Sequence, residues 1–219
     1  MRNAVHNLSW QALAIMAALF AIVPTSTFAV TRSTDMSSVG IGYAETELGD
    51  LVADAIRANL KTDIAFITAG EMKEVTLPKG EISSQDIINA ITYRNDTIVI
   101  LTLRGEQIKQ ALERSLTIYP QKNLGFLQVS GLRFTFDPSK PKESRVISIT
   151  VDGSPLDPAR TYSVGVTNSL ANGALGYFRI WGKGQITSVT KTSMAQAVQD
   201  YLQANPRLDY RKGRITIAR

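Results

Sequence analysis

Residues 97–116 read TIVILTLRGEQIKQALERSL, and this stretch sets the fold class. Residues 97–103 are β-branched or apolar at almost every position, which is typical of a buried strand. After Gly105 the apolar residues recur at helical spacing, at Ile108, Ala111, Leu112 and Leu116. A buried strand followed at once by an amphipathic helix predicts an α+β (mixed α/β) fold. The connection carries a single glycine, so we do not expect a phosphate-binding glycine loop.

The same patterns extend in both directions along the chain. A helical repeat begins near Glu45, a short buried strand covers residues 63–68, and Ser83 and Ser193 are placed to cap two further helices. The later part contains four strand-like stretches separated by turn residues, and a last strand covers residues 214–218: FLQVSG, LRFTFD, RVISITVDG, TYSVGVTN and RITIA. Neither a linker nor a repeat interrupts this order, so we expect one domain over residues 45–219.

The N-terminus has the pattern of an export signal. Arg2 precedes an apolar run over residues 10–23, which is followed by Pro24 and the small-residue site Thr27-Phe28-Ala29. The run is shorter than the ~20 apolar residues of a membrane-spanning helix. We therefore expect a signal peptide over residues 1–29, cleaved after Ala29, then a flexible leader over residues 30–44. The protein would be exported, periplasmic or extracellular, without a stable membrane anchor.

The composition excludes several kinds of catalytic site. The chain has no cysteine, and its single histidine, His6, lies within the expected signal peptide. The mature protein would therefore lack imidazole and thiol groups, which excludes a histidine-rich metal site, a Ser-His-Asp triad and a Cys-His pair. Without residues 1–29 the chain has 23 basic and 19 acidic residues, scattered along the sequence. Solvated surface is a better interpretation of these charges than nucleic-acid binding.

Two carboxylates four residues apart, Asp50 and Asp54, lie opposite the apolar face of the first expected helix. Such a pair could serve acid–base chemistry. We expect them instead on a solvated face, because the sequence offers them no obvious partner.

Six motifs in the same order resemble the C-terminal domain of 5'-nucleotidases over nearly the whole mature chain. This domain is the substrate-specificity half of enzymes whose N-terminal half is a dinuclear metallophosphoesterase. The motifs are ETELGDLVADAIR, DIAFITAG, LRGEQIKQALERSL, GFLQVSGLRFTFDPSKPKESRVISITVDGSPLD, TYSVGVTNSLANGALGYF and KGRI.

The resemblance implies a nucleobase held between two aromatic rings. The positions that match the family's aromatic residues are Phe126, in the GFLQVSG strand, and Tyr177, in the ANGALGY loop. Gly125 would free the backbone and allow the Phe126 ring to face a flat ligand. The alternative is that both rings pack in the core.

The phosphate side departs from the family pattern. Lys73 stands at the position of a family arginine and retains the charge without the bidentate fork. Arg94, beside Asn95, could compensate, and we take Lys73, Arg94 and Asn95 as further ligand-binding candidates. Three departures weaken the expected clamp: Glu71 adds a negative charge to the loop, Gly42 replaces an arginine, and Leu175 replaces an acidic residue.

The metal-binding half of these enzymes has no counterpart in the chain, so we assign no catalytic residue, no metal ligand and no cofactor to it. Divalent metals would belong only to a separate catalytic chain. We expect a stand-alone domain that binds a nucleotide or nucleoside-like molecule and needs a separate metallophosphoesterase subunit for hydrolysis. Two alternatives remain open: a hydrolase active on its own, and a structural or interaction domain that has lost the ligand.

Overall fold

A five-stranded mixed sheet forms the centre of the protein. The computed structural model of the chain describes residues 27–218, so most of the expected signal peptide lies outside the described residues. The strand order is β12-β6-β11-β3-β7, with β11 parallel to β3 and the other neighbours antiparallel. Their bounds are Ile186–Ser193 for β12, Thr97–Arg104 for β6, Thr161–Thr167 for β11, Ile64–Thr68 for β3 and Leu127–Ser130 for β7.

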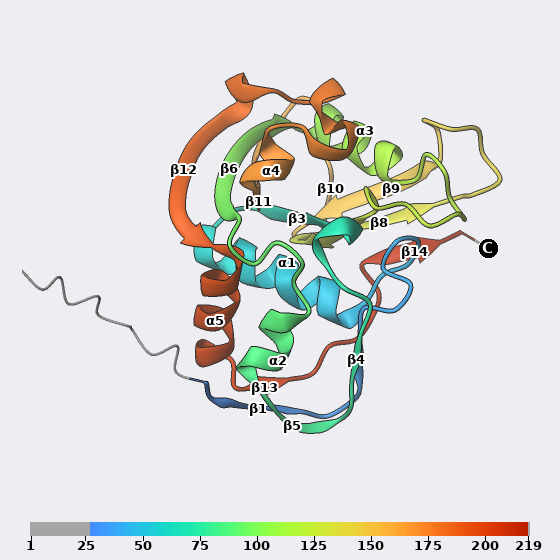
Figure 1. Cartoon of the computed structure of the whole chain (residues 1–219). Helices are drawn as coiled ribbons and strands as arrows, with labels where there is room; N and C mark the ends of the chain where they lie inside the picture. The colour runs from blue at the N-terminus through green and yellow to red at the C-terminus, as the bar shows by residue number, and fades with distance from the viewer. Residues whose placement is uncertain (1–26, 219) are drawn as a thin grey trace, which may run out of the picture.

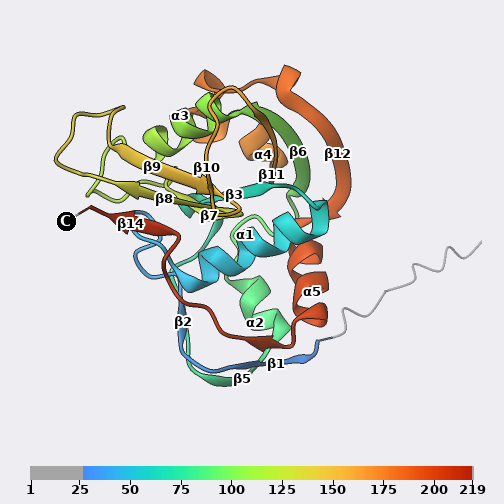
Figure 2. The same ribbon diagram turned by 180° about the vertical axis from the view of Figure 1, so that it is seen from behind.

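Helices cover both faces of this sheet. On one side α1 (Glu47–Leu60) packs on β3, β7 and β11, and α5 (Met194–Ala204) packs on α1. On the other side lie α3 (Gly105–Ser115) and the short α4 (Asn168–Ala171), as Figures 1 and 2 show from opposite directions. The remaining helix, α2 (Ser84–Asn89), packs on α5. The mixed α/β fold expected from the sequence is confirmed.

A second sheet continues from the first at its β7 edge. Its strand order is β10-β9-β8-β14, where β8 (Leu132–Phe136) follows β7 after a single glycine. The other members are β9 (Val146–Val151), β10 (Ser154–Pro155) and β14 (Ile215–Ile217). The parallel pair β14–β8 brings the end of the described chain back to its middle.

The predicted helix starts hold because side chains satisfy the first free backbone N–H groups. Ser83 Oγ accepts from the Asp86 N–H at 3.2 Å, and Ser193 Oγ accepts from the Gln196 N–H at 3.1 Å. Thr46 caps α1 in the same way, at 3.2 Å from the Gly49 N–H. Between these ends the apolar faces of the helices pack into one core with both sheets.

The expectation of a flexible leader over residues 30–44 is wrong. This segment contains β1 (Ala29–Arg32), which lies between β5 (Gly80–Ser83) and β13 (Arg207–Leu208), and β2 (Met36–Ser37), which pairs with β4 (Thr76–Leu77). Val30, Met36 and Ile41 are buried. The segment has too few apolar residues to show a periodicity, and its order comes from strands distant in the sequence.

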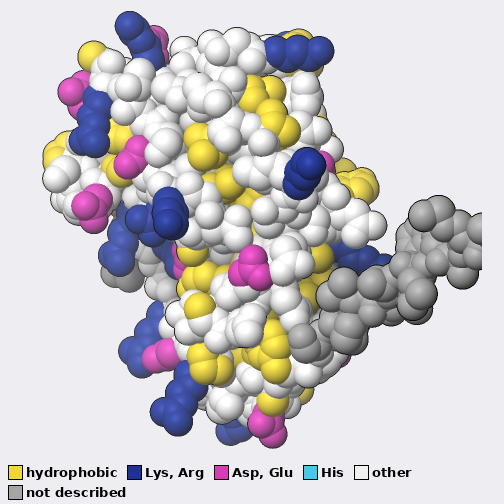
Figure 3. Space-filling view, turned by 90° about the vertical axis from the view of Figure 1, so that its left-hand side faces the viewer, with side chains coloured by type: hydrophobic (Ala, Val, Ile, Leu, Met, Phe, Trp, Pro, Cys, Tyr) yellow, Lys and Arg dark blue, Asp and Glu magenta, His cyan; other side chains and the backbone are white. Residues whose placement is uncertain are grey.

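Strand β12 forms an outer edge of the central sheet and was not expected from the sequence. Its residues are mostly polar, half of them are exposed and the others are partly buried, and its pairing with β6 is interrupted by two irregularities. Figure 3 shows this side of the molecule, where small hydrophobic groups lie among polar atoms and charged side chains are scattered. Within residues 27–218, no helix is long and apolar enough to cross a membrane.

The turn between β7 and β8 depends on Gly131. Its φ is +78°, and a Cβ added there would lie 2.0 Å from the Asp63 carbonyl oxygen. Gly153 has almost the same φ, +77°, but its added Cβ would have no neighbour within 4 Å. Comparing substitutions at these two glycines therefore separates the cost of the left-handed backbone conformation from the cost of steric overlap.

We predict that Gly153→Ala lowers the free energy of unfolding by ~1 to 2 kcal/mol, the cost of the left-handed conformation. Gly131→Ala should lose a further ~1 to 3 kcal/mol, because backbone atoms must move to accept the methyl group. Urea denaturation followed by circular dichroism measures both. Equal losses in the two variants would contradict the overlap at Gly131.

Candidate functional site

The loops that carry most of the expected ligand-binding residues meet at the end of the central sheet where β3 and β11 finish, and not beside one of its outer strands. Strands β3 and β11 run parallel and end there at Thr68 and Thr167. Strands β7 and β6 begin at the same edge, with Leu127 opposite Thr68 and Ile98 opposite Thr167. Ligands of α/β proteins are commonly bound outside the carboxyl ends of parallel strands. We call the loops at this edge, residues 69–73, 91–96, 123–126 and 168–178, the strand-end site.

Glu71 joins the ends of β3 and β11 from inside the protein. Its carboxylate accepts hydrogen bonds from the Thr68 N–H at 2.6 Å, from Thr68 Oγ1 at 2.9 Å and from Thr167 Oγ1. Burial raises the pKa of the Glu71 carboxyl, and these hydrogen bonds oppose the rise. The expectation that Glu71 places its charge in the ligand loop is wrong, because the side chain turns inward to close the strand ends.

The structure brings Lys73, Arg94 and Asn95 to one exposed surface. Lys73 Nζ donates to the Asn89 carbonyl oxygen at 2.9 Å, and an Arg94 Nη donates to Asn89 Oδ1 at 3.5 Å. All three candidates are exposed, although Lys73 lies more than 20 residues before the other two in the sequence. Two cations held beside one neutral residue can both reach an anion that approaches this surface.

Phe126 and Tyr177 lie in the core and not on this surface. Phe126 is 1% exposed and Tyr177 is fully buried. The Tyr177 hydroxyl donates to the Gly125 carbonyl oxygen at 2.7 Å, and its ring stacks on Trp181 with centroids 4.9 Å apart. Burial also raises the pKa of the Tyr177 hydroxyl well above its usual value. The expected pair of exposed stacking rings is therefore not formed by these two residues.

Leu175 contributes to the burial of these two rings. It has a φ of +56° and packs against Gly70 and Gly125, which brings the loop of residues 168–178 onto the loop that precedes β7. The aromatic rings exposed in these loops are others, Tyr93 at 60% and Phe178 at 65%. Sequence reasoning missed both, because Tyr93 lies outside the six motifs and the aromatic position of the ANGALGYF stretch is assigned to Tyr177, the residue before Phe178.

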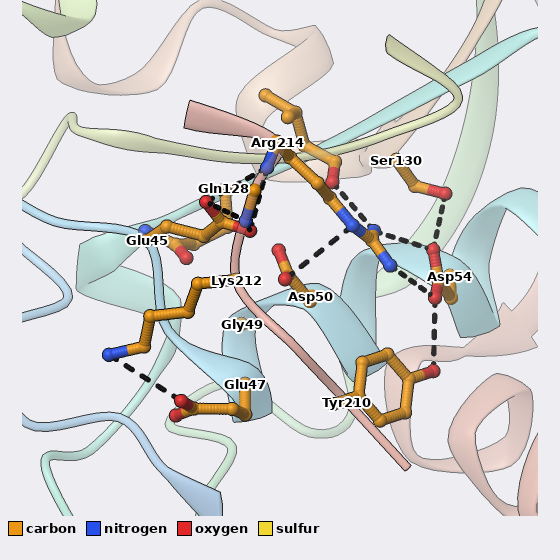
Figure 4. Close-up of polar contacts among 12 residues, drawn as sticks. Glu45, Glu47, Gly49, Asp50, Asp54, Gln128, Ser130, Tyr210, Lys212 and Arg214 are labelled. Carbon is orange, nitrogen blue, oxygen red and sulfur yellow. Dashed lines mark hydrogen bonds and ion pairs between the residues drawn. The ribbon is translucent and has the colours of Figure 1, made fainter. Parts of the chain in front are cut away.

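A second polar cluster, the Arg214 network, lies beyond the other edge of the sheet (Figure 4). The Arg214 guanidinium binds both oxygens of Asp54, at 2.7 and 2.8 Å. Asp54 also accepts from Ser130 Oγ at 2.5 Å and from the Tyr210 hydroxyl at 3.0 Å. We define the network by Glu45, Asp50, Asp54, Ser130, Tyr210 and Arg214. It joins α1, β7 and the C-terminal segment.

The position of Asp50 shows that the expectation of a solvated face for Asp50 and Asp54 is wrong. Its side chain is buried, and neither of its oxygens has a hydrogen-bond partner among the described residues. The nearest opposite charge is Arg214 Nε, at 3.5 Å from Asp50 Oδ2. The pKa of Asp50 is raised to about 9, chiefly by burial and also by Glu45, while the opposite charge of Arg214 opposes the rise. Sequence spacing placed Asp50 and Asp54 together, but their partner lies 160 residues away from Asp54.

Other motif residues also serve the structure. The Glu45 carboxylate accepts from three successive backbone N–H groups, those of residues 213–215, at 2.8 to 2.9 Å. Gln128 accepts from the Thr46 N–H at 2.8 Å and donates to the Ala44 carbonyl oxygen at 2.8 Å. These contacts fix the start of α1 against β7 and the chain end.

The described residues do not fit a metal centre of the kind found in a metallophosphoesterase. Residues 27–218 contain no histidine or cysteine, and no group of three or more Asp and Glu among them is arranged to hold a metal ion. In the Arg214 network a guanidinium already lies among the carboxylates, where a cation would have to bind.

We predict that Asp50→Asn changes how stability depends on pH. The folded protein keeps a proton on Asp50 up to about pH 9, whereas the unfolded chain releases it near 3.8. Rising pH between these values therefore favours unfolding, by up to ~1.4 kcal/mol per pH unit for this one proton. The free energy of unfolding, measured by chemical denaturation across this range, should decline less with rising pH in Asp50→Asn than in the unaltered protein. Asp152→Asn, at an exposed carboxyl, is the control, and an unchanged decline in Asp50→Asn would contradict the assignment.

We predict that Arg214→Lys destabilises the protein by ~1 to 3 kcal/mol, because lysine cannot reproduce the two-pronged contact with Asp54. Arg211→Lys is the matched control, since Arg211 is 85% exposed and 3.7 Å from its partner Asp209. That variant should lose no measurable stability. Thermal and urea unfolding of both variants tests the difference, and similar losses would show that the network contributes little.

Comparison with known proteins agrees with the motifs. The family model described as "5'-nucleotidase, C-terminal domain" matches residues 25–181. An apyrase from Aedes albopictus is 33% identical over 146 residues, which cover 61% of this chain and 26% of the apyrase. A snake venom 5'-nucleotidase from Macrovipera lebetinus is 27% identical over 161 residues, covering 64% of this chain and 39% of that protein.

Among solved structures, the 5'-nucleotidase precursor from Thermus thermophilus matches with a TM-score of 0.75 at 30% identity. The match covers 86% of this chain and 39% of that one. The chain thus spans between about a quarter and two fifths of the length of these relatives. The resemblance inferred from the six motifs is confirmed: the chain belongs to the family of the 5'-nucleotidase C-terminal domain.

Proposed function

We propose that this protein is an exported domain that binds a nucleotide or nucleoside-like molecule at the strand-end site. Hydrolysis of a 5'-nucleotide would need a separate metallophosphoesterase chain. The observation that carries the proposal is the meeting of Lys73, Arg94 and Asn95 on one exposed surface at the carboxyl ends of β3 and β11. Family membership supports the nucleotide chemistry.

The phosphate group would lie against Lys73 and Arg94. Both side chains now donate to Asn89, which is a neutral acceptor. A phosphate oxygen carries charge and is therefore a stronger acceptor for the same donors. Because Glu71 is turned inward and hydrogen-bonded, its carboxyl group does not face the incoming anion.

The base would lie on an aromatic ring other than Phe126 or Tyr177, since both are buried. Tyr93 is 60% exposed and directly precedes Arg94, so a base stacked on it leaves the phosphate close to the basic pair. Stacking on a ring tolerates any base. In this proposal Phe126 and Tyr177 keep the loops in shape.

Two other functions make different predictions. A hydrolase active alone would turn over nucleotides without a second chain, and a purely structural domain would bind none. The absence of histidine and cysteine after His6 favours the partner-dependent domain over the first of these. The exposed basic pair favours it over the second.

We predict that the protein binds AMP more tightly than adenosine in calorimetric titrations. Lys73→Ala or Arg94→Ala should weaken AMP binding about tenfold or more, the effect of losing a charge-assisted hydrogen bond of ~1.5 to 3 kcal/mol. Adenosine binding should change little in these two variants, whereas Tyr93→Ala should weaken both ligands. Lys109→Ala, at an exposed lysine on α3, is the matched control.

No saturable binding of either ligand, or AMP binding unaffected by both basic substitutions, would reject the proposal. A phosphatase assay with added divalent metal separates the alternatives. Turnover by the pure chain that a chelator abolishes would favour the independent hydrolase.

A further inference from the structure

A groove lies at the other end of the central sheet, where β3 begins and β7 finishes, away from the strand-end site. It consists of two adjoining cavities of about 980 and 580 Å³, which share Asp54, Arg133, Tyr201 and Arg214. Thr62, just before β3, and Ser130, at the end of β7, line the larger cavity. The five residues of β3 separate this groove from the strand-end site, a distance of ~16 Å along the strand.

The lining of the groove is strongly basic. It contains three aspartates, Asp54, Asp152 and Asp209, against seven cationic side chains: Arg57, Lys61, Arg133, Arg207, Arg211, Lys212 and Arg214. In the sequence these cations are spread over more than 150 residues. Only the packing of α1, β8 and the C-terminal segment gathers them in one place.

Several of these cations are not used by the fold. Lys61, Arg133 and Arg207 are exposed, and within residues 27–218 their side chains form no hydrogen bond or ion pair. Arg57 uses only its Nε, which donates to the Asp63 carbonyl oxygen at 3.0 Å. Four cationic groups thus face the groove with donors available for a ligand.

The floor of the groove is polar and close to neutral. The charge of Asp54 is balanced by the two-pronged contact with Arg214, and its oxygens also accept from Ser130 and Tyr210. The Tyr201 and Tyr210 hydroxyls are hydrogen-bonded to each other at 2.9 Å. This bonded floor supports a fixed shape, and the Asp54 carboxylate within it is neutralised by Arg214; Asp152, at the exposed margin, is the one lining carboxylate without a hydrogen bond or ion pair among residues 27–218.

We propose that this groove is a second binding site that takes the phosphodiester backbone of a single-stranded oligonucleotide. The four available cations are distributed over both cavities, which suits a linear ligand with repeated charges better than a single phosphate. Three of them are arginines, whose planar guanidinium matches phosphate oxygens in pairs. A concave groove also suits a single strand better than it suits a flat membrane surface.

The test is fluorescence anisotropy of a labelled oligothymidylate of about 15 nucleotides, the upper range of a single-strand binding site, with the purified chain at several salt concentrations. We expect saturable binding that weakens as salt increases. The triple variant Lys61→Ala/Arg133→Ala/Arg207→Ala should bind at least tenfold more weakly at low salt. Its slope of log affinity against log salt should be smaller by about two, at ~0.7 per lost phosphate contact on a single strand.

The matched control is Lys109→Ala/Lys140→Ala/Lys142→Ala, which removes the same charge from exposed lysines outside the groove. This variant should bind as the unaltered protein does, and circular dichroism checks that both triple variants are folded. An absence of binding at low salt, or equal losses in both variants, would overturn the proposal.

Two competitors complete the test. Heparin, a polyanion without phosphate, should displace the oligonucleotide less well than unlabelled oligonucleotide does, and equal displacement would overturn the assignment to phosphodiesters. AMP should not compete, since competition would mean that both ligands use one site. Titrating the groove triple variant with AMP keeps the two proposals distinguishable. If this variant loses oligonucleotide binding but still binds AMP, the loss is specific to the groove.

Discussion

The contact between Arg214 and the carboxylates of α1 is the interaction on which the rest of the structure depends. It brings the last described segment of the chain onto the first long helix, and β14 then pairs with β8 from a fixed position. The Asp54 carboxylate is poorly hydrated there, so an arginine partner compensates for the cost of burying its charge, whereas burial keeps the Asp50 carboxyl protonated. Because Ser130 binds the same Asp54, the contact also fixes β7 against α1.

This network changes how the family motifs are understood. Glu45, Asp54, Gln128 and Arg214 come from the first, fourth and last motif segments, yet in the structure they contact one another or the same stretches of backbone. Their chemistry is used for folding and not for a ligand. A carboxylate pair or a buried glutamine in such motifs is therefore no sign of a catalytic site. The residues left for binding are exposed side chains outside these contacts.

The central sheet separates two surfaces of different character. At one edge the ends of β3 and β11 support a small basic surface beside exposed aromatic rings, and at the other edge a larger groove is lined by cations. Both carry exposed basic side chains, which agrees with the excess of basic over acidic residues. The length of β3 lies between them, and the two surfaces share no residue.

The sequence by itself determined the main helices and strands, because their periodicity and capping residues are local. Ser83 and Ser193 cap helices as predicted, and the strand over residues 97–103 is present as β6. It could not determine β1 or β12, which are polar or short and owe their order to distant partners. Nor could it show that Phe126 and Tyr177 face inward, since a ring looks the same in a sequence whether it packs in a core or faces a ligand. Only tertiary structure decides burial and long-range charge pairing, because both depend on which segments meet in space.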